Sequence, residues 1–343
     1  MKTNYEPKEK FVERMNILLK DKEDVKKFFE TAKTLPKKSI RINTLKITPK
    51  ELIQRIKKYD WKITQIKDNP EIIRIESQLK PGEIGKTREH ILGYYYVQEI
   101  TSMMPILALQ PKPNDIFLDL CASPGSKTTQ AAALMENKGT IIANDLSIGR
   151  IAILSANLQR LSVTNTIVTR HPGTELFTKL IKLNFKFDKI LVDAPCSGEG
   201  NCRISPRTFL EWSESLLKGL SRKQKKLIQA GFDLLNKDGE MIYSTCTHAP
   251  EENEEVVNHL LENNPNAEIL PITNLPIKTR EGITEWNNKP LNPSLKNAKR
   301  IYHHDNDMEG FFLCKIKKTS EETKKTGENS IWKHYTHQIK RKY

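Results

Sequence analysis

The stretch IFLDLCASPGSKTTQ, residues 116–130, decides the fold of this chain. Its first part, IFLDL, is typical of a buried strand, and Gly125 opens a turn into a helix expected at about 126–135. A P-loop is excluded, because Ser126 separates Gly125 from Lys127. The nicotinamide fingerprint is excluded as well, since Gly125 stands alone rather than in G-x-G-x-x-G. The sequence therefore predicts a tight strand-to-helix turn whose backbone can approach a ligand.

The carboxylate of Asp145 occupies a position at which sheets that bind nucleosides carry an acidic residue. Asp145 lies 20 residues beyond Gly125, at the end of the next expected strand, GTIIAND (139–145). At this place an acidic side chain accepts both hydroxyls of a ribose. A purely structural turn around Gly125 is the alternative. With Asp145 in position, the pattern favours the binding of an adenosine.

The remaining chain alternates short apolar strands with helices. This alternation predicts an α/β protein with a doubly wound, mostly parallel sheet covered by helices on both faces. Residues 1–88 are predicted to form a small N-terminal α/β domain, 89–316 the main domain, and 317–343 a basic, flexible tail. In the small domain we expect a helical segment at 11–32 and strands at 40–47 and 72–76. In the main domain the later expected strands are TIVTR (166–170), DKILVDA (188–194), EMIYST (240–245) and GFFLCKI (310–316), the last one antiparallel.

Composition narrows the function classes. The chain of 343 residues carries a formal net charge of +14, which favours a polyanionic partner such as nucleic acid over a merely basic cytoplasmic protein. Five cysteines without a C-x-x-C pair argue against a disulfide framework and against structural zinc, so no metal site is expected. No apolar run approaches the roughly 20 residues of a membrane span. These features predict a soluble cytoplasmic protein without a membrane partner.

Two cysteines each follow an expected strand, Cys196 in LVDAPCSGEG (191–200) and Cys246 in MIYSTCTHAP (241–250). The carboxyl ends of parallel strands meet at the edge where open sheets bind ligands, so both thiols are expected there. Neighbouring strands would bring them to about 5 Å, within reach of one substrate ring. Because a thiolate is the strongest nucleophile among side chains, covalent catalysis is the hypothesis. The alternative is that both are small buried apolar side chains.

The segment FDKILVDAPCSG (187–198) resembles the signature of the NOL1/NOP2/Sun (RsmB/NOP-type) family of RNA cytosine-C5 methyltransferases. CASPGSK (121–127) and STCT (244–247) are similar to that family's cofactor loop and nucleophile motif. RINTLK (41–46) and GFF (310–312) resemble its N-terminal Arg-x-Asn segment and its last motif, so the similarity covers about 40–316. The resemblance implies a Rossmann-like methyltransferase domain at 89–316 behind an RNA-recognition-like domain.

The same resemblance implies the cofactor and the partner. S-adenosyl-L-methionine is the expected cofactor and RNA the expected substrate, with no protein partner evident. Because the short N-terminal domain gives the chain the size of archaeal members, tRNA is the first expectation and rRNA the second.

The resemblance also assigns roles to single residues. The cysteine at the position of Cys246 attacks cytosine C6, which turns the ring into an enamine whose C5 can take a methyl group. The cysteine at the position of Cys196 assists release of the product. Asp193 is expected to hydrogen-bond the N3/N4 edge of cytosine, and Lys127 to supply positive charge near the thiols. The expected cofactor-binding residues are Cys121, Ala122, Ser123, Pro124, Gly125, Ser126, Lys127, Asp145, Arg150, His171 and Asp193.

One position departs from the family pattern. After the third strand the family carries an Asp followed by a small residue, whereas this chain reads Thr-Arg-His-Pro-Gly at 169–173. His171 is expected to take the place of the carboxylate on the adenine side, with weaker cofactor binding as the consequence. A second hypothesis follows from this departure: an RNA-binding assembly factor that keeps the fold with little turnover.

Contact with RNA is expected from basic and aromatic side chains near the thiols. The tyrosines of GYYYV (93–97) are either a platform for stacked bases or aromatic core between the two domains. The candidate phosphate contacts are Lys37, Lys38, Arg41, Arg203 and Arg207.

Overall fold

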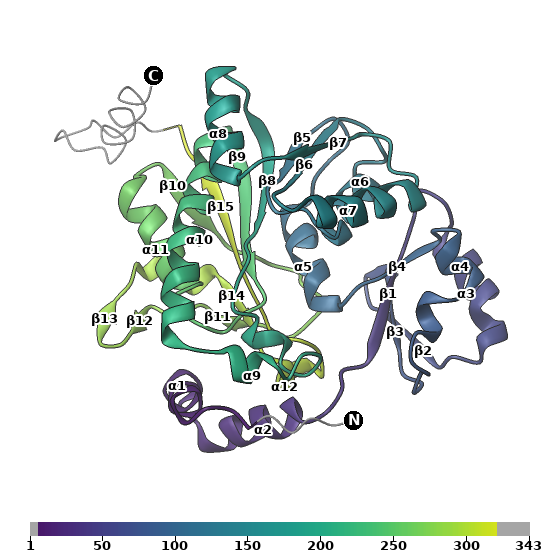
Figure 1. Cartoon of the computed structure of the whole chain (residues 1–343), viewed down its shortest axis with the longest axis horizontal. Helices are drawn as coiled ribbons and strands as arrows, with labels where there is room; N and C mark the ends of the chain where they lie inside the picture. Colours follow the sequence, from purple (N-terminus) through teal and green to yellow (C-terminus); the bar gives the residue numbers. More distant parts are fainter. Residues whose placement is uncertain (1–5, 321–343) are drawn as a thin grey trace.

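The computed structural model describes residues 6–320, apart from the side chains at 173–175 and 177. At its centre lies a nine-stranded sheet (Figure 1). Its parallel part is formed by β5 (Ile116–Asp119), β6 (Thr140–Asp145), β7 (Thr166–Arg170), β8 (Phe187–Asp193) and β9 (Leu235–Thr245). The spatial order β9-β8-β5-β6-β7 reverses direction between β5 and β8, so the predicted doubly wound sheet is confirmed.

The other edge of the sheet is antiparallel. β15 (Phe311–Lys318) pairs with β9 in antiparallel register, as predicted for GFFLCKI. β14 (Lys299–Ile301) and β11 (Arg280–Glu281) continue this edge, and β10 (Ala267–Leu270) pairs with β15. The strand β9 begins at Leu235, five residues before the expected start at 240, and Asp238 within it adopts a positive φ of 62°.

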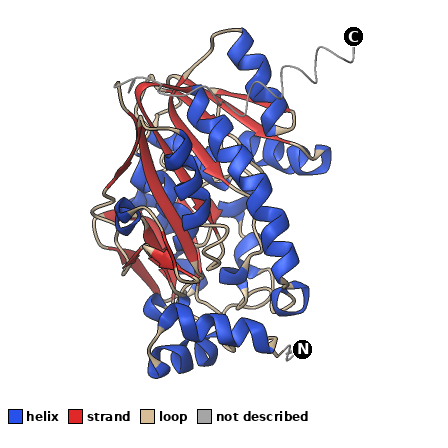
Figure 2. Ribbon diagram, turned by 90° about the vertical axis from the view of Figure 1, so that its left-hand side faces the viewer, coloured by secondary structure: helices blue, strands red, loops and turns tan. Residues whose placement is uncertain are grey.

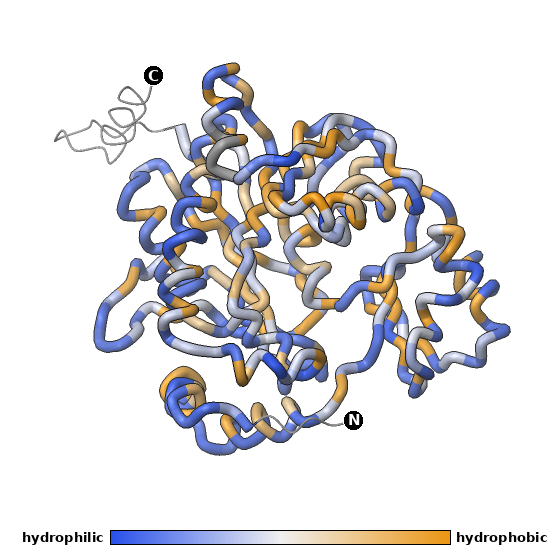
Figure 3. Tube along the Cα trace, viewed as in Figure 1, coloured by the Kyte–Doolittle hydropathy of each residue, from blue (hydrophilic) through white to orange (hydrophobic). Residues whose placement is uncertain are grey.

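Helices cover both faces of this sheet (Figures 1 and 2). The side-chain alternation of the strands separates two cores: Leu118 and Ile190 pack toward one helix layer, whereas their neighbours Phe117 and Leu191 pack toward the other. Apolar segments, orange in Figure 3, run along the strands between these layers. The first layer consists of α8 (Gly173–Lys182), α10 (Glu214–Leu234) and α11 (Glu254–Asn263); the second consists of α5 (Ile100–Leu109), α6 (Ser126–Leu134) and α7 (Ile148–Arg160).

A second sheet precedes the large one in the chain. Its order is β2-β3-β1-β4, and all of its pairs are antiparallel. α3 (Pro49–Ile56) packs its Leu52 against Ile40 and Ile73 of this sheet and begins at a capping box of Thr48 and Glu51. The strands are β1 (Lys38–Ile42), β2 (Ile63–Ile66), β3 (Asn69–Ile75) and β4 (Tyr95–Val97).

The first two helices pack away from this small sheet. α1 (Glu9–Leu19) and α2 (Lys22–Ala32) replace the single predicted helical segment, because Asp21 caps a new helix by accepting the N–H of Glu23. The ring of Phe11 lies 5.3 Å from that of Phe209 and 5.6 Å from that of Trp212, both in the main domain. The chain also returns to the small sheet at β4, beyond residue 88. The domain boundary at 88 therefore stays a prediction.

Short elements complete the part of the chain that the structure describes. They are η1 (Lys57–Tyr59), η2 (Glu83–Gly85), α4 (Arg88–Ile91), η3 (Glu199–Asn201), α9 (Thr208–Glu211), β12 (Glu285–Trp286), β13 (Lys289–Pro290), η4 (Pro293–Asn297) and α12 (His303–Asn306). None of the helices within 6–320 is both long and apolar enough to cross a membrane. The predicted tail lies mostly outside the described residues; of its positions, Lys317 and Lys318 belong to β15.

Candidate active site

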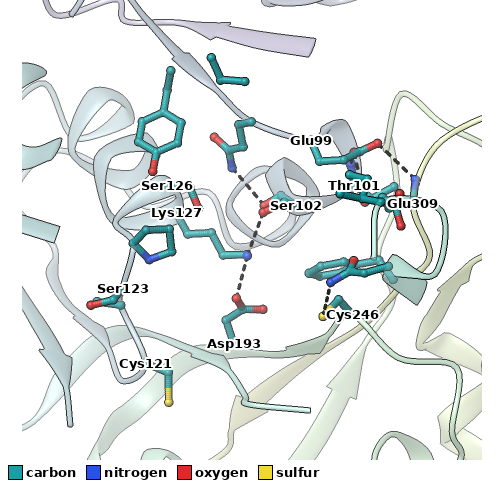
Figure 4. A pocket seen from close by; sticks show the side chains of 18 of the residues that line it. Glu99, Thr101, Ser102, Cys121, Ser123, Ser126, Lys127, Asp193, Cys246 and Glu309 are labelled. Carbon is teal, nitrogen blue, oxygen red and sulfur yellow. Dashed lines mark hydrogen bonds and ion pairs between the residues drawn. The ribbon is translucent and has the colours of Figure 1, made fainter. Parts of the chain in front are cut away.

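A pocket of about 470 Å³ opens at the carboxyl ends of β5, β8 and β9. This edge lies where the strand order reverses, which is where open α/β sheets bind their ligands. Figure 4 shows Cys121 and Ser123 at one end of the pocket and Cys246, Glu99 and Glu309 at the other.

The loop between β5 and α6 forms the first end of the pocket. Gly125 adopts a φ of 99°, and a Cβ on it would come within 2.9 Å of Leu154 Cδ1 on α7. The turn therefore requires glycine both for its conformation and for its approach to the helix. From α7, Arg150 donates to the carbonyl of Ser123 at 2.6 Å and Asn157 to that of Pro124 at 2.9 Å. The loop is held in place before any ligand binds.

Two buried polar atoms at this end have no hydrogen-bond partner within the described residues. They are Oδ1 of Asp119 and Oγ of Ser123, and both residues line the pocket. Burial, followed by the charge of Asp193, raises the pKa of Asp119 to about 7, while Thr128 donates to its other oxygen at 2.7 Å. Such unsatisfied groups are the places where a polar cofactor would bind. The residues present therefore fit S-adenosylmethionine.

An ion pair crosses the middle of the pocket. Lys127 Nζ lies 2.7 Å from Oδ2 of Asp193 and also donates to Ser102 Oγ at 2.9 Å. Ser244 Oγ donates to the other oxygen of Asp193 at 2.8 Å. The Lys127 side chain is almost fully buried, because it crosses from the start of α6 to the end of β8. A cation and a carboxylate are thus held between the two ends of the pocket.

The two predicted thiols meet at the far end. The sulfur atoms of Cys196 and Cys246 are 3.2 Å apart, closer than the strand spacing led us to expect. Cys246 lines the pocket and accepts a hydrogen bond from Asn201 Nδ2 at 3.2 Å, whereas Cys196 is absent from the residues found to line it. The hydrogen bond to Cys246, followed by burial, raises the pKa of the Cys196 thiol well above its usual value. Cys246 is therefore the sulfur that a substrate would meet.

Four predicted cofactor residues are not among those that line this pocket: Gly125, which forms the turn itself, and Asp145, Arg150 and His171. Asp145 accepts the N–H groups of Ser123 at 3.2 Å and Ser147 at 3.0 Å, and Arg150 Nη2 lies 3.4 Å from its carboxylate. Asp145 and Arg150 thus form one group behind the cofactor loop. His171 directly follows β7, and its backbone N–H donates to Asn144 Oδ1 at 3.1 Å. Their predicted contacts with the cofactor stay predictions.

Two of the predicted phosphate contacts are wrong. Arg41 and Arg203 are each only 2% exposed, so neither can meet a phosphate at the surface. Arg41 donates to Gln98 Oε1 and to the Ser126 carbonyl, both at 2.6 Å, and so joins the small sheet to α6. Arg203 donates to Asp307 at 2.6 Å and to the carbonyls of Thr34 and Met308.

The remaining RNA candidates differ in exposure. Lys37, Lys38 and Arg207 are exposed and stay candidates for phosphate contacts. Tyr95 and Tyr96 are buried, which favours the interpretation of aromatic core between the two sheets.

Several pocket residues were not predicted. Asp119 ends β5 as Asp145 ends β6, so the rule of a carboxylate at a strand end would have found it. Glu309 directly precedes the GFF motif, which the sequence analysis used only for its resemblance. Asn201 lies in η3, and no local pattern marks it.

Comparisons with known proteins identify the family. The family described as 16S rRNA methyltransferase RsmB/F matches residues 106–317, and the N-terminal domain of 16S rRNA methyltransferase RsmF matches residues 8–100. The chain belongs to the RsmB/F family. This is the family identified from the motifs, and the expectation of S-adenosylmethionine as cofactor is confirmed with it.

Among curated relatives, ribosomal RNA small subunit methyltransferase F of Erwinia tasmaniensis is 36% identical over 317 residues, which is 90% of this chain and 63% of that protein. The protein of the same name from Vibrio cholerae is 36% identical over 338 residues, 96% of this chain and 68% of that protein. This RsmB/F chain thus spans about two thirds of the length of these relatives.

Solved structures show the same fold. A methyltransferase homolog protein from Pyrococcus horikoshii superimposes with a TM-score of 0.79 at 32% identity, covering 92% of this chain and 96% of that one. NSun6 from Pyrococcus horikoshii, solved with SFG, gives 0.77 at 24% identity and covers 92% of this chain and 99% of that one. The second likeness concerns the fold alone.

Proposed function

We propose that this RsmB/F protein transfers a methyl group from S-adenosylmethionine to C5 of a cytosine in RNA, with small-subunit rRNA as the substrate class. The observation that carries the proposal is the pair of sulfur atoms 3.2 Å apart at one end of a pocket whose other end is the cofactor loop. A pocket that only bound a nucleotide would have no use for two adjacent thiols. Cytosine C5 needs activation by a nucleophile, and a thiol at this place supplies one.

We assign the nucleophile to Cys246, because its sulfur faces the pocket. As a thiolate it forms a bond to C6 of cytosine, and the C5–C6 π electrons move to C5. S-adenosylmethionine supplies an electrophilic methyl group. Loss of the C5 proton then restores the double bond while the bond between sulfur and C6 breaks. Cys196, whose sulfur is adjacent, assists this last step.

Lys127 and Asp193 position and stabilise the reacting base in this proposal. The Asp193 carboxylate accepts from the exocyclic amine of cytosine, and the Lys127 ammonium, 2.7 Å from that carboxylate, holds it in place. The same ammonium places a positive charge in the half of the pocket where the thiolate adds. Asp119, Ser123 and the loop backbone at 121–126 would hold the cofactor.

The choice of RNA rests on the names of the relatives. The size of the chain, with its short N-terminal domain, led us to expect tRNA, but the Erwinia and Vibrio relatives are named small-subunit rRNA methyltransferases. That observation favours rRNA and makes tRNA the second candidate. A cytoplasmic location, where either RNA is available, stays a prediction.

The assembly-factor hypothesis depends on His171 in place of a carboxylate. His171 lies beside Lys179, with its ring 3.4 Å from Nζ, at the end of β7. A protein that had lost catalysis would not need the Lys127–Asp193 pair and the two thiols. We therefore expect cofactor binding and turnover.

Methyl transfer from isotope-labelled S-adenosylmethionine tests the proposal. The protein is incubated separately with small-subunit rRNA and with total tRNA, and 5-methylcytosine is measured by mass spectrometry of the digested RNA. Labelled 5-methylcytosine in rRNA, lost in Cys246→Ala and kept in Cys314→Ala, is expected. Cys314 is a matched control, because it is a buried cysteine on β15 away from the pocket. Labelling of tRNA alone would overturn the substrate class, and cofactor binding without labelling of either RNA would favour the assembly factor.

A further inference from the structure

Glu309 has an unusual position in the wall of the pocket. Its side chain is only 2% exposed, and neither carboxyl oxygen has a hydrogen-bond partner within the described residues. Glu309 lines the pocket at the end where Cys246 lies (Figure 4). A buried carboxyl without partners is costly unless a ligand completes its hydrogen bonds. The position of Glu309 therefore indicates contact with whatever occupies the Cys246 end.

The surroundings of Glu309 decide its protonation. Glu99, at the start of α5, accepts the backbone N–H of Glu309 at 3.2 Å and two hydrogen bonds from Thr101. Burial raises the pKa of Glu99 as well, but these donors oppose that rise, whereas Glu309 has none, so the pair keeps its proton on Glu309. Burial, followed by the charge of Glu99, raises the pKa of Glu309 to about 8. The opposing cations are Arg203, which follows η3, and the exposed Lys38 of β1, and both lower it.

The backbone fixes Glu309 relative to the nucleophile. Gly310 donates its N–H to the carbonyl of Gly200 at 2.9 Å, and Gly200 donates to the carbonyl of Cys246, also at 2.9 Å. A Cβ on Gly310 would come within 2.4 Å of the His248 ring. These two hydrogen bonds and the close packing hold the loop before β15 beside the end of β9. The carboxyl of Glu309 and the sulfur of Cys246 are thus parts of one rigid wall.

We propose that Glu309 binds the target cytosine as a neutral acid and donates its O–H to the C2 carbonyl oxygen. This proposal rests on the proposed function. If Asp193 takes the exocyclic amine, O2 is an acceptor of the base that still needs a donor. Addition of the Cys246 thiolate at C6 spreads negative charge over C5, N3 and O2, so a donor at O2 also stabilises the adduct. An ionised Glu309 would instead repel both the adduct and the approaching polyanion.

The pH dependence of Glu309→Gln tests this role. Methylation of the RNA substrate is measured as kcat/KM between about pH 6.5 and pH 9 for the full chain and for Glu309→Gln. Any pH effect that the two proteins share cancels in their ratio. Because glutamine keeps a neutral donor at every pH, the ratio of unmodified protein to variant should be about tenfold lower at pH 9 than at pH 6.5. Glu309→Ala should be slower than both at pH 6.5.

Glu99→Gln provides the matched variant. Removal of the Glu99 charge eases ionisation of Glu309. The kcat/KM of Glu99→Gln, divided by that of Glu309→Gln, should therefore begin to fall at a lower pH than the same ratio for the unmodified protein. A flat ratio for the unmodified chain, or a folded Glu309→Gln as slow as Glu309→Ala at every pH, would overturn the proposal for Glu309. If no variant and no RNA gives 5-methylcytosine, the proposed function fails instead, so the two failures are distinguishable. Circular dichroism on each variant identifies any that has not folded.

Discussion

Cys196 and Cys246 occupy unequal positions although their sulfur atoms touch. Cys246 faces the pocket, whereas Cys196 lies behind it and keeps its proton because of the contact with Cys246 and its burial. Once Cys246 is bonded to the base, Cys196 is the thiol left to assist elimination. Replacement of Cys246 and replacement of Cys196 should therefore block different steps of the reaction.

We predict that Cys196→Ala accumulates a covalent protein–RNA adduct. The variant can still form the bond between Cys246 and C6, but the adduct resolves slowly without the second thiol. Denaturing gels with labelled RNA should show a retarded band for Cys196→Ala that is absent from Cys196→Ala/Cys246→Ala. A retarded band in Cys246→Ala instead would reverse the two roles.

Glu252 adds a pH dependence to stability near the same thiols. It is buried, accepts hydrogen bonds from the Ser197 N–H at 3.0 Å and Gln224 Nε2 at 2.7 Å, and burial raises its pKa to about 7. The folded protein therefore holds a proton that the unfolded chain releases between about pH 4.5 and pH 7. This contribution to stability is present at low pH and is lost as the pH rises through 7.

We predict that Glu252→Gln removes this slope. The unfolding free energies of the variant and of the unmodified chain are measured in urea at about pH 5 and at about pH 8. The value for the variant minus that for the unmodified chain should be roughly 3 kcal/mol higher at pH 8 than at pH 5. The absolute stability of the variant is not the test, because its amide leaves a donor without a partner. An equal difference at both pH values would show that Glu252 ionises normally in the folded state.

At the scale of elements, Arg203 and Arg207 are close in sequence but have different roles. Arg203 is buried and joins η3 to the loop before β15 and to the end of α2. Arg207 is exposed and pairs with Glu211 one turn further along. Both were predicted as phosphate contacts from their place after Cys196, but only Arg207 is available to a phosphate.

We predict opposite results for the two arginines. Arg203→Ala should lower the unfolding free energy by about 2–4 kcal/mol, because several charge-assisted hydrogen bonds are lost from a buried site. Arg207→Ala should change stability by less than about 0.5 kcal/mol, since its ion pair is solvated. Arg207→Ala should weaken RNA binding and its salt dependence instead. Thermal unfolding measures the stability of the two variants, and filter binding measures their affinity for RNA. An equal loss of stability in both variants would contradict the different roles assigned to Arg203 and Arg207.

The sequence predicted the elements whose signal is local. β5, β6, β7 and β8 lie within a residue of their expected ranges, because each is an apolar run closed by a turn. The thiol pair followed from the same signal, since parallel strands end together. Asn201 and Glu309 were missed, and Arg41 and Arg203 were misassigned, because burial of a polar side chain depends on partners far away in the chain. The packing of α1 and α2 on the main domain was missed for the same reason, because it also depends on residues far away in the chain.

At the scale of the whole molecule, a network of hydrogen bonds joins α2 to β11 and α12 of the main domain. Arg280 of β11 donates to both carboxylate oxygens of Asp24 on α2 and to Asp305 of α12, and His304 lies 2.8 Å from Asp24. Asp24, His304 and Asp305 have the spacing of a metal site, but the Arg280 guanidinium already pairs with these carboxylates. The hydrogen bond from Arg280 holds the pKa of Asp24 at about 2.

We predict that Arg280→Met loosens α1 and α2 while the central sheet stays folded. Hydrogen exchange should accelerate in residues 9–32 far more than in β5 or β8. Lys278→Met is the matched control, because Lys278 pairs with the same Asp305 but is exposed and does not contact Asp24. Uniform acceleration through the sheet would mean that the helices are not a separate unit. Because the pKa of Asp24 is lowered, the attachment should persist above about pH 4 and weaken as the pH falls toward 2.

The contacts of α2 also set an order of assembly. The helix is synthesised before its partners: the carbonyl of Phe28 is bonded to His303, 275 positions later, and Asp24 is bonded to His304, 280 positions later. The cofactor loop, by contrast, is held by α7, some 30 positions away. Closing such long loops is slow and costs chain entropy, which is offset only when the contacts of α2 with His303 and His304 form. A nascent chain stalled before residue 300 would hold a finished loop for the cofactor, but the wall around the base would lack Glu309 and Phe311.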